Sequence, residues 1–447
     1  MSKLLITNAR VVGGGGIAEA DVLIEGERIE KIAGGIAAGE GVEVLDARGR
    51  YLLPGMIDDQ VHFREPGLTH KADIESESIA AIAGGITSFM DMPNVNPQTT
   101  TREALAAKYE RAAGRARANY AFYLGATNHN IGEIQALEVN EACGIKCFMG
   151  ASTGDMLVDD PDALERLFAE APLLVVTHCE HSPTIRENEA KARAEYGEDV
   201  PMSEHPAIRS AAACLKSSST AVELARRHDA RLHILHLTTA VEMGLFSSAG
   251  RLEKRITAEV CVHHLWFDES DYVDLGTLIK CNPAIKTAKD RAALVAAVNE
   301  GRIDVIATDH APHTLDEKRN PYFEAPAGLP LVQHALLVLF DLAAEGKLSV
   351  ETIVERTSHA PADIYGVVDR GYVREGYFAD LVLVDPDRPH TVERSNLLYK
   401  CGWSPFEGHT FRSSIDTTLV NGRVVYGDGA PTGVVAGQRL QLNRGRQ

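Results

Sequence analysis

The sequence predicts an α/β fold: a (β/α)8 TIM-like barrel with a small β-sandwich domain formed from both termini. Between about residues 55 and 370, apolar runs of strand length alternate with helical stretches, as expected for parallel strands joined by helical crossovers. Polar residues recur directly after these runs, where barrel enzymes hold their active sites. A doubly wound sheet is the alternative, but no glycine-rich nucleotide loop follows the first strand of this region.

The β-domain is expected to combine residues 1–53 with residues 373–435. Both parts contain strand-like runs bounded by glycine-rich turns, namely 4–6, 22–24, 42–45, 380–384 and 417–425. The pair Asn421-Gly422 favours a tight hairpin turn inside the last run. The polar residues 436–447 are expected to form a loose tail.

The barrel is expected to span residues 54–372. An apolar run at 51–57 leads into it, and its further strand candidates are 85–90, 121–124, 144–149, 173–177, 232–235 and 304–307. Helices are expected at 104–118 and 291–300.

Composition narrows the class of protein and its partners. The formal net charge is −18, which argues against nucleic acid or an anionic membrane as the main partner, since both require a basic surface. The seven cysteines are scattered and form no CxxC pair, so we expect free thiols in a reducing cytoplasm. The chain begins without the apolar core of a signal peptide, and it contains no apolar run of about 18 residues that could span a membrane.

The segment 58–67, directly after the first of these runs, carries the most informative polar residues. Alternate residues of a strand point the same way, so Gln60, His62 and Arg64 can share one face. A histidine can bind a metal, and an arginine can grip a carboxylate through two parallel hydrogen bonds. Gln60 is the odd member of this set, because a neutral amide is a poor ligand for zinc.

His178, His236 and Asp309 also end apolar runs. Any one of them alone is as readily explained by a structural role. Their recurrence favours a metal site, because a divalent metal needs several converging ligands. Asp309 could bind the metal and take a proton from water, or it could cap the next helix.

Lys146 lies inside an apolar run, where a charged ammonium is costly unless it is paired. One interpretation is a lysine that snorkels or pairs with an acid. The other is a lysine carboxylated by CO₂, whose carbamate oxygens could bridge two metal ions. Sequence patterns alone leave both open.

Several loop residues after the strands have two interpretations. Asn94 and Asn282 each neighbour prolines and could simply belong to tight loops, or they could hold a carboxylate or an amide of a substrate. His310 and His313 flank Ala311-Pro312, and either could merely orient a neighbour. The adjacent pair His263-His264 favours a structural role.

These motifs in combination resemble those of the dihydroorotases, a branch of the amidohydrolase superfamily that is similar to hydantoinases and allantoinases. Residues 91–97 (DMPNVNP) look like the DMPNTNP signature of that branch, and residues 308–313 (TDHAPH) look like its TDHAPH motif. Residues 62–67 (HFREPG) look like the latter part of its HxHxRxPG motif. Residues 144–149 resemble its strand with the carboxylated lysine. The resemblance covers nearly the whole chain.

The resemblance implies a barrel that holds one or two zinc ions, with Lys146 carboxylated. The metal shell that it implies is His62, Lys146, His178, His236 and Asp309. The substrate-binding set that it implies is Arg64, Asn94, Asn282, His313 and the backbone of Ala327 and Gly328. It further implies a homodimer that takes a small-molecule substrate.

The implied reaction interconverts dihydroorotate and carbamoyl aspartate. Asp309 would take the proton of the attacking water and deliver it to the leaving nitrogen. Arg64 favours dihydroorotate over allantoin, because dihydroorotate carries a free carboxylate. The alternatives are a cyclic amidohydrolase for allantoin or a hydantoin, and a non-catalytic barrel that supports aspartate transcarbamoylase.

Gln60 departs from the family pattern, which usually has a metal-binding histidine there. Three outcomes are open: weak ligation through the amide oxygen, substitution by a water molecule, or a site with one zinc ion or none at the exposed position.

Overall fold

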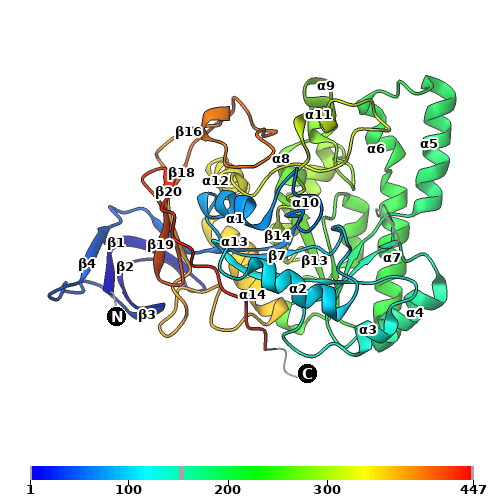
Figure 1. Cartoon of the computed structure of the whole chain (residues 1–447). Coiled ribbons are helices and arrows are strands. Elements are labelled where there is room, and N and C mark those ends of the chain that lie inside the picture. The colour runs from blue at the N-terminus through cyan, green and yellow to red at the C-terminus, as the bar shows by residue number, and fades with distance from the viewer. Residues whose placement is uncertain (1–2, 151–155, 444–447) are drawn as a thin grey trace.

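The computed structural model describes residues 3–150 and 156–443. Figure 1 shows a terminal β-sheet, with strands from both ends of the chain, beside a larger body of strands and helices. The barrel strands of the larger body all pair in parallel.

The terminal sheet is a nine-stranded mixed sheet. Its strands are β1 (Lys3–Gly13), β2 (Gly16–Glu25), β3 (Arg28–Ala33), β4 (Glu43–Asp46), β5 (Tyr51–Pro54), β15 (Leu381–Asp385), β18 (Ser414–Val420), β19 (Arg423–Gly427) and β20 (Ala430–Pro431). The two ends of the chain meet where β5 pairs antiparallel with β15, with Leu52 opposite Leu383. This confirms that both termini build one β unit. The hairpin predicted at Asn421-Gly422 joins β18 to β19.

The barrel strands alternate with helices along the chain. These strands are β6 (Met56–Val61), β7 (Ile86–Asp91), β8 (Asn119–Phe122), β9 (Leu124–Gly125), β10 (Ile145–Phe148), β11 (Val175–His178), β12 (Leu232–Ile234), β13 (Ile256–Cys261) and β14 (Val305–Ala307). Only Tyr123 separates β8 from β9, so the two share one place in the ring. Val61 bridges in parallel to His310, which brings the last strand back to the first. The predicted TIM-like barrel is therefore confirmed.

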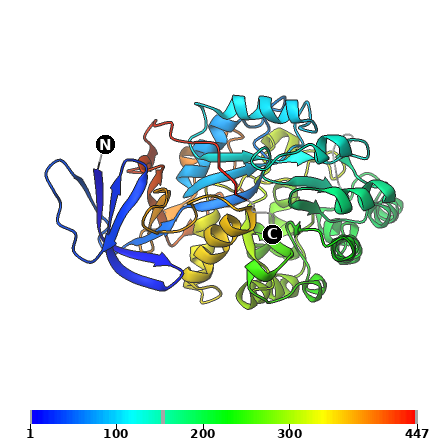
Figure 2. The same ribbon diagram turned by 90° about the horizontal axis from the view of Figure 1, so that it is seen from below.

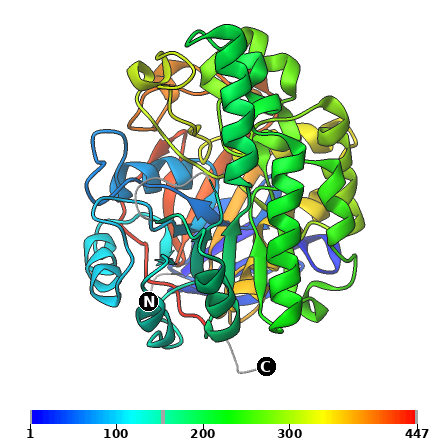
Figure 3. The same cartoon turned by 90° about the vertical axis from the view of Figure 1, so that its right-hand side faces the viewer.

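Helices cover the outside of the barrel, as the view from below shows (Figure 2). The α-helices are α1 (Ile74–Ala83), α2 (Arg102–Ala112), α3 (Ile131–Gln135), α4 (Pro161–Glu170), α5 (Ser182–Tyr196), α6 (His205–Ile208), α7 (Ala211–Arg227), α8 (Val262–Trp266), α9 (Tyr272–Leu275), α10 (Ala288–Glu300), α11 (Leu315–Lys318), α12 (Ala335–Ala344), α13 (Val350–Val354) and α14 (Ala360–Tyr365). Figure 3 shows α5 and α7 (green) on the side away from the terminal sheet.

Local sequence explains the ends of α10. Thr287 accepts a hydrogen bond from the backbone of Asp290, and the Asp290 side chain bonds back to Thr287, which forms a capping box. Gly301 ends the helix at φ 76°, a left-handed conformation that favours glycine. The helix therefore begins three residues before the predicted range of 291–300.

The apolar run at 51–57 divides between the two parts of the molecule. Its first residues form β5 in the terminal sheet, and its last residues begin β6 of the barrel. Gly55 stands between the strands, where a Cβ atom would lie 2.2 Å from the side chain of Thr87. A glycine is therefore required where the chain passes from sheet to barrel.

The C-terminal segment differs from the loose tail that its polarity predicts. Leu440 and Leu442 are buried, at 1% and 2% exposure. The backbone N–H of Leu440 donates to Tyr120 (2.9 Å), and that of Asn443 donates to Gly366 (2.7 Å). Apolar residues that alternate with polar ones let this segment bind along the barrel. Residues 444–447 lie outside the described part.

Within residues 3–150 and 156–443, none of the helices is both long and apolar enough to cross a membrane. All seven cysteines fall within these ranges, and none is joined in a disulfide within them.

Candidate functional site

A cavity of about 750 Å³ opens at the carboxyl ends of the barrel strands. Every residue that the sequence predicts for the site lines it: Gln60, His62, Arg64, Asn94, Lys146, His178, His236, Asn282, Asp309, His313, Ala327 and Gly328. The strands of a closed parallel barrel all point the same way, so residues far apart in sequence meet at one face.

Three of these residues have a left-handed backbone conformation, which residues other than glycine rarely adopt. Arg64, His236 and Asp309 have φ angles of 66°, 38° and 50°. Non-glycine residues in this region store strain and cluster at functional sites. All three residues line the cavity, two or three positions after the ends of β6, β12 and β14.

His62 and Asp309 form the first close pair. Nε2 of His62 lies 3.1 Å from Oδ1 of Asp309, and Nδ1 lies 2.8 Å from Oδ1 of Asn94. The Asn94 oxygen and the Asp309 carboxylate both accept, so the Nδ1–H tautomer of His62 donates to Asn94 and the Nε2–H tautomer donates to Asp309. Burial opposes ionisation of Asp309, yet the hydrogen bond with His62 holds the pKa of this carboxyl below its usual value. Asn94 thus orients a predicted metal ligand.

His178 and His236 form the second pair. Nδ1 of His178 lies 2.9 Å from Nε2 of His236. Nε2 of His178 donates to Glu180 (2.9 Å), whose carboxylate also accepts from Arg209 (2.6 Å). Burial lowers the pKa of His178 and lowers that of His236 well below its usual value, so both are neutral imidazoles. Sequence reasoning missed Glu180 and Arg209, which orient His178 from outside the cavity.

Lys146, on β10, lines the same cavity as the two pairs. It is 1% exposed, and burial lowers the pKa of its amine to about 8. Its Nζ lies 4.6 Å from the centre of the Phe148 ring. A buried lysine with a depressed pKa spends more time as the free amine, the form that reacts with CO₂.

These donors fit a zinc centre chemically. Zinc prefers imidazole nitrogens and carboxylate oxygens, and both pairs offer them from inside one cavity. Nδ1 of His236 makes no hydrogen bond with any described residue. His62, Lys146, His178, His236 and Asp309 would hold the metal. Among the described residues, two further groups could hold an ion: Cys261 with His263 and His264, and Asp59 with His233 and Glu259.

The amide oxygen of Gln60 does not face the predicted metal ligands. Its Nε2 donates to Oδ1 of Asp309 (3.0 Å), and its Oε1 accepts a weak bond from Cys261 Sγ (3.7 Å). A carboxylate can only accept, so the amide nitrogen must face Asp309. Of the three outcomes for this position, ligation through the amide oxygen is the one that this orientation disfavours.

Two cationic side chains, Arg64 and Lys71, flank His313 at one end of the cavity, where Lys71 also pairs with Glu317 (2.8 Å). Arg64 donates from Nε to the carbonyl of Pro312 (3.0 Å), and its Nη2 lies 3.0 Å from Nε2 of His313. Lys71, which sequence reasoning missed, lies 3.0 Å from Nδ1 of His313. Burial and the neighbouring Arg64 push the pKa of His313 well below its usual value. A neutral histidine between two cations suits a ligand that carries a carboxylate.

The loop that closes this end is held from behind. Nζ of Lys318, which is fully buried, donates to the carbonyls of Pro326 (2.9 Å) and Gly328 (3.0 Å). A Cβ atom on Gly328 would lie 2.3 Å from the carbonyl oxygen of Ala311. The loop can therefore approach the cavity only with glycine at this position. Oδ1 of Asn282, also in the cavity, has no hydrogen-bond partner within the described ranges.

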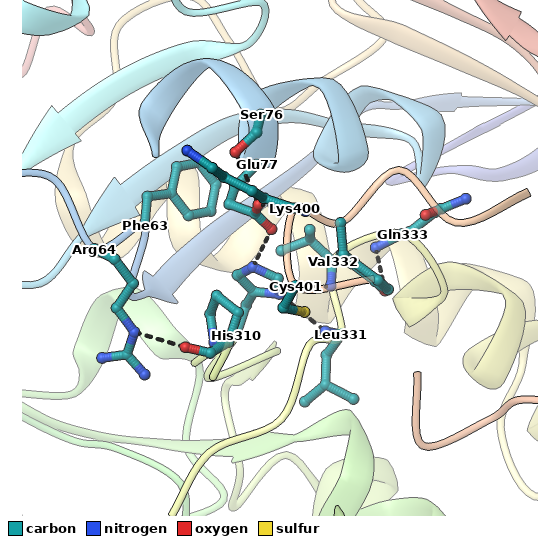
Figure 4. Close-up of polar contacts among 12 residues, drawn as sticks. Phe63, Arg64, Ser76, Glu77, His310, Leu331, Val332, Gln333, Lys400 and Cys401 are labelled. Carbon is teal, nitrogen blue, oxygen red and sulfur yellow. Dashed lines mark hydrogen bonds and ion pairs between the residues drawn. The ribbon is translucent and has the colours of Figure 1, made fainter. Parts of the chain in front are cut away.

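The ring of His310 points toward Glu77, as Figure 4 shows, and His310 is not among the described residues that line the cavity. Its Nε2 lies 2.8 Å from Oε2 of Glu77, and its Nδ1 accepts from the backbone N–H of Leu331 (2.9 Å). Glu77 also accepts from the backbone of Lys400 (3.1 Å). Of the two histidines left open by the sequence, His313 lines the cavity, and His310 anchors the loop that carries Asp309.

Comparison with known proteins adds relatives that match almost end to end. The family model described as "Amidohydrolase family" matches residues 51–425. A dihydroorotase of Halobacterium salinarum is 35% identical over 431 residues, which is 94% of this chain and 96% of the relative. An allantoinase of Bacillus velezensis is 31% identical over 432 residues, with 95% and 94% covered. The solved L-hydantoinase (dihydropyrimidinase) of Arthrobacter aurescens superimposes with a TM-score of 0.93 at 26% identity, covering 99% and 100%.

Proposed function

The chain belongs to the amidohydrolase family, and we propose that within this family it is a zinc-dependent dihydroorotase. It would interconvert dihydroorotate and carbamoyl aspartate, a step of pyrimidine biosynthesis. The observation that carries the proposal is the positive end of the cavity, where Arg64 and Lys71 flank His313. Dihydroorotate has a carboxylate that these cations would bind, whereas allantoin and simple hydantoins lack one.

Zinc, when bound by His62, Lys146, His178, His236 and Asp309, supplies a Lewis acid that polarises the ring amide carbonyl. Asp309 takes the proton of the attacking water and returns it to the ring nitrogen as the amide bond breaks. The hydrogen bond from Gln60 Nε2 holds the Asp309 carboxylate in place for both transfers. Ring closure of carbamoyl aspartate uses the same groups in reverse.

A substrate panel tests this proposal directly. The purified protein, reconstituted with zinc, is incubated with dihydroorotate, carbamoyl aspartate, allantoin, hydantoin and dihydrouracil. We expect efficient turnover of the first two compounds and at most residual turnover of the other three. Turnover of allantoin with none of dihydroorotate would support the alternative that the Bacillus velezensis relative suggests. A zinc-loaded protein that is inert toward every compound would contradict both.

The amide at position 60 leads to a prediction about metal content. Replacing Gln60 by histidine puts an imidazole where the side chain now donates to Asp309. We expect Gln60→His to bind about one more zinc ion per chain than the unmodified protein, measured by inductively coupled plasma mass spectrometry. Gln60→Met, of similar length but with no strong metal ligand, is the matched control. Equal zinc content in all three proteins would show that position 60 does not limit the metal count.

The buried amine of Lys146 leads to a prediction about pH. Because its pKa is about 8, the free-amine fraction rises about tenfold between pH 7 and pH 9. Reactivation of metal-free protein by zinc, at a fixed concentration of dissolved CO₂, should be faster at pH 9 by a similar factor. The carbamate is followed by ¹³C NMR with labelled CO₂, and Lys146→Gln should give no such signal. A wild-type protein without the signal would rule carboxylation out.

A further inference from the structure

We infer that the barrel interior contains a further site for a small divalent cation, formed by Asp59, His233 and Glu259. The three side chains come from β6, β12 and β13, and each is 0% exposed. One ligand atom of each lies within 4.8 Å of the others. They lie outside the set of described residues that line the catalytic cavity, so the site is separate from the one that the proposed function uses.

The polar atoms of this group are buried without hydrogen bonds. Both carboxylate oxygens of Asp59, Oε2 of Glu259 and Nε2 of His233 have no hydrogen-bond partner among the described residues. Burying carboxylate oxygens without donors is unfavourable, because they lose the water that solvates them outside. All of these unsatisfied atoms can ligate a metal, which indicates that a cation belongs between them.

The distances agree better with a shared ion than with direct hydrogen bonds. Nε2 of His233 lies 3.3 Å from Oδ2 of Asp59 and 3.6 Å from Oε2 of Glu259. A charged hydrogen bond would bring nitrogen and oxygen to about 2.7–2.9 Å. Zinc bonds of about 2.0–2.2 Å place neighbouring ligand atoms of a tetrahedron about 3.3–3.6 Å apart.

The other face of His233 fixes its tautomer. Nδ1 lies 2.7 Å from Oγ1 of Thr257, whose hydroxyl in turn faces the carbonyl of Leu232 at 3.3 Å. That carbonyl can only accept, so the Thr257 proton points to it and Nδ1 of His233 donates to Oγ1. Nε2 of a neutral His233 therefore presents its lone pair to the two carboxylates. A histidine oriented through its other nitrogen in this way is typical of metal ligands.

The competitor of the cation is protonation of the group. Two carboxylates and a neutral imidazole carry −2, which a divalent cation neutralises. Protons can do the same: although burial lowers it, the two carboxylates raise the pKa of His233 to about 9, and burial together with Asp59 raises that of Glu259 to about 8. The geometry favours the cation, because the contacts are 3.3 and 3.6 Å long and the polar atoms lack hydrogen bonds.

The site would also support the catalytic cavity. Oε1 of Glu259 accepts from the backbone N–H of His236 (3.1 Å). An ion that holds the other oxygen of Glu259 would fix this carboxylate, and through it the start of the strained segment at His236.

Metal analysis of the full-length protein tests the inference. We expect Asp59→Asn and His233→Gln each to lose about one ion per chain relative to wild type, by mass spectrometry. Glu242→Gln is the matched control, because Glu242 is also buried but its oxygens are bonded by Ser218 (2.5 Å) and Thr239 (2.6 Å). The double variant His178→Asn/His236→Asn should lose metal from the cavity and still retain the interior ion.

A second measurement does not depend on the variants being folded. Crystals of the wild-type protein grown with zinc should give an anomalous difference peak at the zinc edge between the three side chains. Absence of that peak, or unchanged metal content in folded Asp59→Asn, would overturn the inference and assign a proton to the group. Either result leaves the substrate panel unaffected, because the panel reports on the cavity alone.

Discussion

Replacing Arg64 by alanine should lower kcat/KM for dihydroorotate by about 30- to 5,000-fold, which corresponds to about 2–5 kcal/mol for removing one partner of a buried charge pair. The guanidinium is 6% exposed and lies at the positive end of the cavity. Its loss leaves the substrate carboxylate with Lys71 alone at this end. The steady-state rate of dihydroorotate hydrolysis, followed in the ultraviolet, measures the change.

Two comparisons separate carboxylate recognition from damage to the fold. Arg64→Lys keeps the charge but loses the planar fork, so it should recover only part of the loss. Any residual activity on hydantoin, which has no carboxylate, should be changed far less by Arg64→Ala than the activity on dihydroorotate. An equal loss on both compounds, or unchanged affinity for dihydroorotate, would refute the role assigned to Arg64.

Replacing Asp309 by asparagine should lower kcat by about 10²- to 10⁴-fold while KM changes little, because the amide keeps the shape but cannot take a proton. The carboxylate is 8% exposed and accepts from Gln60 (3.0 Å) as well as contacting His62 (3.1 Å). Single-turnover measurements with excess protein would show whether the chemical step itself has slowed.

Asp58 offers a matched control for this experiment. It is fully buried next to the same loop and accepts from the hydroxyl of Thr308 (2.6 Å). Burial raises the pKa of Asp58 to about 8, so it is mostly neutral at pH 7 and an asparagine resembles its native form. Asp58→Asn should therefore keep kcat within about tenfold. Comparable losses in both variants would mean that Asp309 acts through structure rather than through proton transfer.

Sequence patterns predicted the architecture well wherever strands are uniformly apolar. The strand β13 was missed because Glu259 interrupts its apolar run, and the interruption has a tertiary cause: its carboxylate lies beside His233 inside the barrel. The run at 51–57 resembles one strand in the sequence, because nothing local shows that β5 and β6 join different sheets. The exact start of a helix is set by a single capping residue, such as Thr287 for α10, and the broader apolar pattern does not reveal it.

Most residues of the candidate site could also be predicted from the strand pattern. Residues at strand ends could be predicted to meet, because a closed barrel brings all of those ends to one face. The residues that were missed come from loops or lie behind the cavity. Lys71 precedes α1, and Glu180 depends on Arg209, which follows α6. No local pattern reveals such partners, because their contacts exist only after distant segments have packed together. Glu77, the partner of His310, could not be predicted for the same reason, because it is distant in the sequence.

The joint between β5 and β15 has a consequence for how the protein is made. Leu52 faces Leu383, so the edge of β5 that does not pair with β1 lacks its partner until most of the chain has been synthesised. At about 5–20 residues per second, that delay is on the order of tens of seconds. During this delay, the unpaired backbone N–H and C=O groups of β5 can form hydrogen bonds with other strands, including those of other nascent chains. Chaperone capacity and translation speed in the expression host should therefore govern the yield of native protein.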